Sequence, residues 1–113
     1  MVGLFKALSE ESRLRILALL MQSEMCVCEI EASLNMTQSS ASRHLTLLKR
    51  SGILECYKVA QWSYYRIDEK FKIENIDLWN YLQVKLKEIP TYQRDLEEGV
   101  KCKALHICEN IKM

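Results

Sequence analysis

The sequence predicts a mainly α-helical fold that carries one small β-hairpin, in the α+β class. Apolar residues recur at helical spacing before residue 50 and again after residue 75, which indicates helices in both halves of the chain. Between them, "ILECYKVAQWSYYRID" is rich in β-branched and aromatic residues that alternate with more polar neighbours. This alternation is typical of a half-buried hairpin.

The chain has 113 residues, which is enough for one domain with a modest core. We expect that domain to cover residues 1–90, and residues 91–113 to form a C-terminal tail without a clear role in the fold. No apolar run approaches the roughly 18 to 20 residues that a membrane-spanning helix needs, and the N-terminus does not have the pattern of an export signal. We therefore expect a cytoplasmic protein with no membrane partner, whose five cysteines stay reduced or bind metal.

Two helices are predicted near the N-terminus. The segment "VGLFKAL" has the composition of a short apolar helix. The next helix has Ser9 as a plausible N-cap and Glu11 in its first turn, where a carboxylate interacts favourably with the helix dipole. Its apolar residues recur at helical spacing: Leu14, Leu17 and Met21.

The following two predicted helices form a helix-turn-helix pattern. "CVCEIEASLN" carries apolar residues at positions i, i+3 and i+7, namely Val27, Ile30 and Leu34. A tight turn at residues 35–37 comes next, and Thr37 is a suitable N-cap for a helix that runs to about Arg50 and is closed by Gly52. Two short helices joined by a three-residue turn define the pattern.

The second helix of this pair has one apolar face and one polar face. Ala41, Leu45 and Leu48 lie within about 60° of each other when plotted at 100° per residue. The opposite face carries hydroxyls, an amide and guanidiniums, whereas a face that is merely solvated would usually include Glu or Asp. Such side chains can pair with bases and phosphates in the major groove of DNA. The predicted DNA-binding residues are Gln38, Ser39, Ser42, Arg43, Thr46, Lys49 and Arg50.

Positive charge concentrates in the same part of the chain. Residues 37–66 carry a net charge of +4, so the rest carries −3 within a total of +1. A local excess of this kind suits phosphates, and the alternative is chance clustering on a solvated face. His44 lies beside the apolar face of the second helix, and we expect it to pack there rather than to bind a ligand.

A hairpin directly after a DNA-recognition helix is a wing, and its predicted turn lies at Ala60 and Gln61. A longer helix then begins after Asn75 and stops at Pro90. Its apolar residues are Ile76, Trp79, Leu82, Leu86 and Ile89. This stripe fits either the core or a dimer seam, and with the apolar N-terminal helix it leads us to expect a homodimer through the N- and C-terminal helices.

Cys26 and Cys28 stand one residue apart at the start of the first helix of the pair. Thiolates are soft ligands that select thiophilic ions over magnesium or calcium. Two cysteines are too few for a structural zinc site, which usually takes four protein ligands, whereas arsenic(III) binds two or three sulfurs. The alternative is that both are small buried hydrophobic residues.

The spacing of the two cysteines also suggests a switch. In an ideal helix, residues i and i+2 are about 200° apart, so Cys26 and Cys28 would point away from each other. One ion would reach both sulfurs only if the first turn opens or never forms. We therefore expect an ion to unwind the helix start and to tilt the next helix out of the DNA groove.

Four segments together resemble the ArsR/SmtB family of metal-responsive repressors: "LSEESRLRILALL", "CVCEI", "SSASRHLTLLKRSGIL" and "YYRI". The resemblance covers roughly residues 3–89. It implies a dimeric winged helix that binds operator DNA with an inverted repeat and releases it when arsenic(III) or antimony(III) binds Cys26 and Cys28. Arsenic-sensing members often have a third cysteine where this chain has Glu31, and the wing tip "KVAQWS" lacks the usual glycine and arginine. Zinc-sensing members have histidine ligands in the last helix, and residues 75–89 contain none.

The remaining cysteines leave two possibilities open. Cys102 or Cys108, in a C-x₃-H-x-C pattern with His106, could supply a third sulfur from the tail, and Cys56 is expected to be structural. The alternative function is a repressor on the same fold that senses persulfides or oxidants through a pair such as Cys28 with Cys102. The chain has no glycine-rich phosphate loop and no nucleophile signature, so we expect neither an enzyme nor a structural cofactor.

Overall fold

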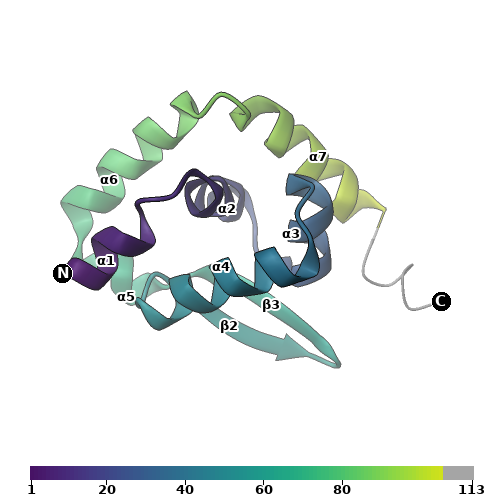
Figure 1. Cartoon of the computed structure of the whole chain (residues 1–113), viewed down its shortest axis with the longest axis horizontal. Helices are drawn as coiled ribbons and strands as arrows, with labels where there is room; N and C mark the ends of the chain where they lie inside the picture. The colour runs from purple at the N-terminus through teal and green to yellow at the C-terminus, as the bar shows by residue number, and fades with distance from the viewer. Residues whose placement is uncertain (106–113) are drawn as a thin grey trace.

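The structure is a computed structural model that describes residues 1–105, and Figure 1 shows its helices and one small sheet arranged around helix α2. The helices are α1 (Val2–Ala7), α2 (Glu11–Gln22), α3 (Val27–Leu34), α4 (Gln38–Arg50), α5 (Glu69–Glu74), α6 (Ile76–Lys85) and α7 (Tyr92–Ala104), with a 3-10 turn η1 (Leu86–Glu88). The strands are β1 (Met25–Cys26), β2 (Leu54–Val59) and β3 (Trp62–Ile67). The predicted class, mainly helical with a small hairpin, is confirmed.

Helix α2 supplies the centre of the core. Its residues Ile16, Leu17 and Leu19 are at most 1% exposed, and they pack in one cluster with Ile30 of α3 and Leu45 of α4. Burying an aliphatic side chain of this size is worth roughly 1.5–3 kcal/mol relative to leaving it exposed. The apolar residues that recur at helical spacing in the sequence are therefore the residues through which these helices pack against one another. Within residues 1–105, no helix combines the length and apolar character needed to cross a membrane.

Local capping interactions fix the helix-turn-helix. Asn35 ends α3 in the left-handed conformation (φ 55°), which turns the chain toward α4. The side chain of Thr37 then accepts a hydrogen bond of 3.1 Å from the backbone N–H of Ser40, as expected for an N-cap. Gly52, with φ of 82°, follows the end of α4. The predicted boundaries of this pair are confirmed.

The start of α2 differs by one residue from the prediction. Its N-cap is Glu10, not Ser9. The hydroxyl of Ser9 instead donates a hydrogen bond of 2.7 Å to the carbonyl of Lys6 at the end of α1. A serine hydroxyl can bond to a carbonyl three residues before it instead of capping the helix after it, and Ser9 does so here.

The sheet is antiparallel, with strand order β1-β3-β2. Val59 pairs with Trp62, so the wing turn consists of Ala60 and Gln61, as predicted, and Ala60 has a positive φ of 56° that such two-residue turns require. Strand β1 was not predicted. Its two residues pair with the middle of β3, Met25 with Tyr65 and Cys26 with Tyr64, and so attach the wing to the body of the protein.

The C-terminal half adds two helices that were not predicted. Helix α5 begins after Asp68, whose carboxylate accepts a hydrogen bond of 2.8 Å from the backbone N–H of Lys70. Helix α6 begins after Asn75, as predicted, and the chain leaves helical geometry before Pro90. Helix α7 then packs alongside α3 and α2, so residues 92–104 have a place in the fold.

An ion pair joins α7 to α2. Arg15 donates two hydrogen bonds of 2.9 Å to the carboxylate of Asp95, and the hydroxyl of Thr91 donates a third of 2.9 Å. The Asp95 side chain is only 3% exposed. Burial alone raises the pKa of Asp95, but the hydrogen bonds from Arg15 and Thr91 outweigh it, so the pKa lies below its ordinary value.

We expect Asp95→Asn to lower the free energy of unfolding by about 2–4 kcal/mol at neutral pH, because it leaves the Arg15 cation without its partner. Urea denaturation measures this change. Because folding lowers the pKa of Asp95, the difference from wild type should be complete at neutral pH and vanish as the pH falls through the folded-state pKa. Glu97→Gln, at an exposed position of the same helix, is the control and should have little effect. Equal stability of wild type and Asp95→Asn would contradict the assigned role.

Candidate DNA-binding face and thiol site

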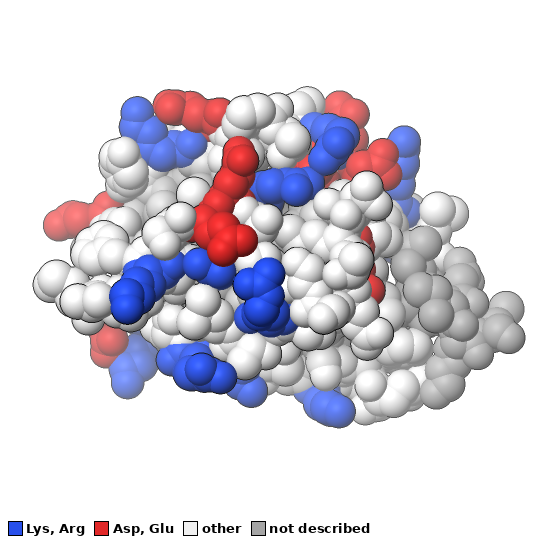
Figure 2. All heavy atoms as spheres, in the orientation of Figure 1, with Lys and Arg blue, Asp and Glu red and all other residues white. Residues whose placement is uncertain are grey.

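All seven predicted DNA-binding residues lie exposed on α4 or at its start, while the opposite face of the helix is buried. The buried residues are Ala41, His44, Leu45 and Leu48. The helix contains no Asp or Glu, and its last turn carries Lys49 and Arg50. Figure 2 shows lysine and arginine side chains gathered over α4 and the hairpin on the face in view. This is a face that can approach a polyanion without repulsion.

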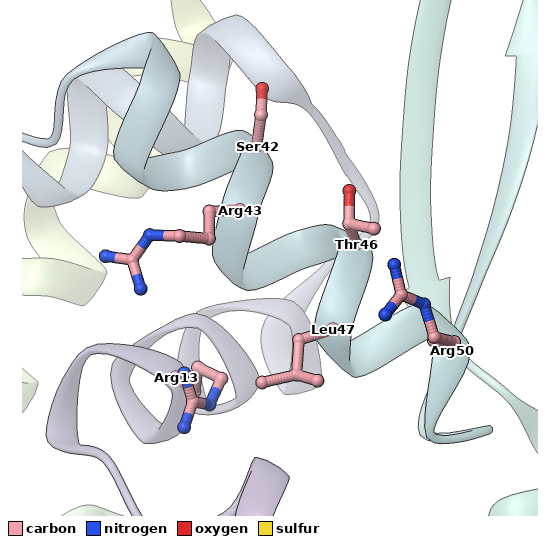
Figure 3. A pocket seen from close by; sticks show the side chains of 6 residues that line it. All are labelled: Arg13, Ser42, Arg43, Thr46, Leu47 and Arg50. Carbon is pink, nitrogen blue, oxygen red and sulfur yellow. The ribbon is translucent and has the colours of Figure 1, made fainter.

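The exposed face of α4 is hollowed by a shallow pocket of about 450 Å³. Its lining residues are Arg13, Ser42, Arg43, Thr46, Leu47 and Arg50. Figure 3 shows the polar side chains projecting from α4, with Leu47 lying between α4 and Arg13. Guanidiniums and hydroxyls around a concave surface are suitable donors for a phosphate group.

One of the basic residues counted in the net charge of residues 37–66 is already paired with carboxylates. Arg66 in β3 donates a hydrogen bond of 3.1 Å to the carboxylate of Glu55 in β2, and its Nη1 lies 3.9 Å from the carboxylate of Glu24. Its charge is therefore balanced within the wing. The positive surface that remains is centred on α4 rather than spread over the whole of residues 37–66.

Arg13, which the sequence analysis did not select, holds α4 against the N-terminal helices. Its guanidinium donates hydrogen bonds to the carbonyls of Ala7 (2.7 Å) and Lys6 (3.1 Å), and Nη1 lies 3.2 Å from Nδ1 of His44. Because a guanidinium only donates, Nδ1 of His44 must accept, and the ring is neutral. Burial lowers the pKa of His44, which favours the same state. His44 is 1% exposed, which agrees with its predicted packing role.

The two cysteines do not share a helical turn, so the predicted 200° separation does not apply. Cys26 is the last residue of β1 and the N-cap of α3, with an extended backbone (φ −83°, ψ 165°). Cys28 is the second residue of α3 and is half-buried. Cys26 is 1% exposed and disulfide-bonded, so its thiolate becomes available as a ligand only after reduction.

Two glutamates organise the start of α3. A carboxylate oxygen of Glu29 accepts a hydrogen bond of 3.0 Å from the backbone N–H of Cys26, which is one half of a capping box. Burial raises the pKa of the Cys28 thiol, and the negative charges of Glu31 and Glu29 raise it further. Glu31, which stands where arsenic-sensing members of the family often have a cysteine, thus adds to the rise that burial causes in the pKa of the Cys28 thiol.

Cys102 lies at the same end of the fold as Cys26 and Cys28. Helix α7 runs antiparallel to α3, because Asp95 lies near the end of α3 and Lys103 donates a hydrogen bond of 2.7 Å to the carbonyl of Glu24, just before β1. Cys102 precedes Lys103 and is buried. No group of three or more His, Cys, Asp or Glu side chains able to hold a metal ion exists among residues 1–105. Cys108 lies outside the described residues.

Comparison with known proteins assigns this geometry to a family. Residues 10–55 match the family model described as "Bacterial regulatory protein, arsR family". The solution structure of the homodimeric winged helix-turn-helix DNA-binding domain of Mb0332 from Mycobacterium bovis, a possible ArsR-family transcriptional regulator, is 32% identical with a TM-score of 0.63. That match covers 72% of this chain and 75% of the other. This chain belongs to the ArsR family.

Two further relatives of this ArsR-family chain are named for resistance to toxic elements. The arsenical resistance operon repressor of Escherichia coli (strain K12) is 43% identical over 67 residues, which are 58% of this chain and 57% of the repressor. The cadmium resistance transcriptional regulatory protein CadC of Listeria innocua is 39% identical over 75 residues, 66% of this chain and 62% of CadC. The matches thus span about three fifths of these relatives. Both relatives are named as regulators of transcription, and the ArsR-family chain has the winged helix-turn-helix fold that its sequence predicts.

The electrostatics of Cys28 in this ArsR-family regulator give a testable consequence. Because Glu31 contributes to the raised pKa of Cys28, Glu31→Gln should speed alkylation of Cys28 near neutral pH by about two- to fivefold. Mass spectrometry of the peptide that carries Cys28 follows the reaction. Glu55→Gln in β2 removes a carboxylate that does not contribute to this pKa and serves as the control. A rate equal to that of wild type in both variants would exclude the role of Glu31.

Proposed function

We propose that this ArsR-family regulator is a repressor that binds operator DNA through α4 and releases it when arsenic(III) or antimony(III) binds Cys26 and Cys28. The observation that carries the proposal is their position at the β1–α3 junction, directly before the helix-turn-helix. An ion that binds these sulfurs acts on α3, the helix that leads into α4. The name of the 43% identical relative, an arsenical resistance operon repressor, supports the choice of inducer.

In this proposal α4 enters the major groove. Its exposed amide, hydroxyl and guanidinium groups contact bases and phosphates, and the pocket beside Arg43 and Arg50 receives a backbone phosphate. The helix is long enough to present all seven predicted residues: Gln38, Ser39, Ser42, Arg43, Thr46, Lys49 and Arg50. Contact between the wing and DNA is secondary, since Arg66 is already paired within it.

A homodimer completes the DNA-binding unit. Helices α1 and α6 leave large apolar side chains exposed. These residues include Val2, Phe5, Ile76, Tyr81 and Val84, each more than half exposed. Covering them with a second copy would remove this apolar surface from water, and the related Mb0332 domain is described as homodimeric. A twofold dimer then reads an inverted repeat whose half-sites lie about 34–36 Å apart.

The inducer site uses sulfur ligands only. After reduction, Cys26 and Cys28 supply two thiolates, and Cys102 or Cys108 supplies a third where one is needed. Arsenic(III) and antimony(III) are thiophilic and accept two or three sulfurs, so the short ligand set suits them. With arsenite, As(OH)3, each thiol that binds passes its proton to a departing hydroxide, which leaves as water, so every As–S bond that forms replaces one As–O bond. The regulator would act in the cytoplasm, beside the operator.

The deciding experiment titrates a complex of the reduced protein and its operator with arsenite, antimonite, cadmium and zinc. Wild type should release DNA with arsenite or antimonite, and the double variant Cys26→Ser, Cys28→Ser should keep it. Cys56→Ser, in β2, is the matched control and should behave as wild type. A hundredfold loss of operator affinity corresponds to about 2.7 kcal/mol of coupling, which is within the usual range. Normal release by the double variant would show that the assigned site is wrong.

Two substitutions on α4 should separate base contacts from phosphate contacts. Arg43→Ala should weaken operator binding by about 1–3 kcal/mol and relax base preference. Lys49→Ala should weaken binding to operator and random DNA alike and reduce the salt dependence. Fluorescence anisotropy on both DNAs at several salt concentrations measures this. If the two variants cannot be distinguished, α4 does not bind DNA in the proposed way.

A second candidate function is favoured by the disulfide at Cys26. On the same fold, a redox-sensing repressor would release DNA when its thiols are oxidised or persulfidated, with no metalloid bound. Release by polysulfide or peroxide alone, reversed by a reductant, would support this function. Release by arsenite under reducing conditions would support the first.

A further inference from the structure

Glu24 connects three elements at the point where the chain passes from α2 to β1. Its carboxylate accepts a hydrogen bond from the hydroxyl of Tyr57 in β2 and lies 3.9 Å from Nη1 of Arg66 in β3. Its carbonyl accepts a hydrogen bond of 2.7 Å from Nζ of Lys103 in α7. The residue therefore ties the wing and α7 to the segment that carries the thiols.

The hairpin residues that contact Glu24 are also held by interactions within the hairpin. The rings of Tyr57 and Tyr64 stack with centroids 5.7 Å apart and an angle of 20° between their planes. The guanidinium of Arg66 lies 4.6 Å from the centre of the Tyr57 ring, and its Nε donates to Glu55. The Tyr57 hydroxyl is thus held toward Glu24, and this hydrogen bond is the main reason that the pKa of Tyr57 is raised to about 12.

Cys26, whose sulfur is a thiol after reduction, lies two residues from this contact. Cys26 pairs with Tyr64 across the sheet, so the same short segment is bound to β3 through its backbone and to β2 through the Glu24 carboxylate. Cys26 is 1% exposed, and a tightly packed site cannot accept a large ion without a shift of the surrounding chain. Such a shift must act on β1 and on Glu24.

We propose that Glu24 is a positioning residue that couples the Cys26 thiol to the wing. In the DNA-binding state its carboxylate holds the β2–β3 hairpin through Tyr57. When an ion binds at Cys26, β1 moves, Glu24 withdraws from Tyr57, and the hairpin loses its fixed orientation beside α4. This inference rests on the proposed function. It adds a second way for ion binding at Cys26 to affect DNA binding, through Glu24 and the hairpin, beside the one through α3 and α4.

The first test is Tyr57→Phe, which removes the hydroxyl and keeps the aromatic ring. Operator affinity without arsenite should fall about three- to tenfold, the effect of losing one hydrogen bond. Affinity at saturating arsenite should not change, because the bond is already broken in that state. The release ratio, which is the operator Kd with arsenite divided by the Kd without it, should therefore fall by the same factor. Tyr92→Phe on α7 is the matched control and should keep the wild-type ratio.

A second variant guards against an effect of Tyr57→Phe on folding. Glu24→Ala should reduce the release ratio at least as much as Tyr57→Phe. The release ratio of the double variant should be no lower than that of Glu24→Ala, because both changes remove the same hydrogen bond between Tyr57 and Glu24. Additive losses would overturn the inference. In the wild type, arsenite should speed hydrogen exchange of the hairpin amides, and unchanged exchange would also overturn it.

Direct measurement of arsenite binding by calorimetry separates this inference from the proposed function. If the reduced wild type does not bind arsenite, both fail. If it binds arsenite and releases DNA, but Tyr57→Phe and Glu24→Ala have the release ratio of Tyr92→Phe, only the role of Glu24 fails. A reduced ratio in both variants, with arsenite affinity at Cys26 and Cys28 retained, supports it.

Discussion

Cys26 belongs to two elements at once, and this junction determines the geometry around it. Its backbone pairs with Tyr64 in β3, and its amide donates to the carboxylate of Glu29 as α3 begins. A strand end and a helix start that share one residue cannot move independently. The orientation of α3, and through the turn at Asn35 that of α4, therefore depends on the same backbone that carries the sulfur. In the proposed function, a ligand that binds at this position therefore acts on both α4 and the β2–β3 hairpin.

The exposed face of α4 depends equally on what holds its other face. Leu45 and Leu48 anchor it in the core, but apolar contacts alone are not directional. Arg13 adds direction, since its guanidinium bonds to the end of α1 and to His44 of α4 in fixed geometry. In a dimer formed through α1, this contact would also fix α4 relative to the partner subunit. The spacing of the two recognition helices then follows from a few buried hydrogen bonds.

Helix α7 approaches the body of the protein closely because Gly99 has no side chain. A Cβ at this position would lie 2.7 Å from Cδ1 of Leu19 and 3.1 Å from Cε of Met25, both of which are buried. The close approach, with the ion pair between Arg15 and Asp95, brings the end of α7 to the region of β1. The segment after Pro90 thus covers the thiol region and offers Cys102 at the same end of the fold.

The sequence by itself determined the elements whose signals are local and repeated. Apolar spacing and caps at Thr37 and Gly52 defined the helix-turn-helix, because helix formation and capping act over three or four residues. The alternation of apolar and polar residues predicted the β-hairpin of the wing. The polar face of α4, which contains no Asp or Glu, was recognised as the exposed one. Strand β1 and the long-range side-chain contacts were decided by the tertiary structure alone. A two-residue strand such as β1 has no period to detect, and the bonds of Arg13 to His44, Arg15 to Asp95 and Tyr57 to Glu24 join residues 31, 80 and 33 positions apart. Such pairings depend on which surfaces the packed core brings together, and that is a property of the whole chain rather than of any one segment.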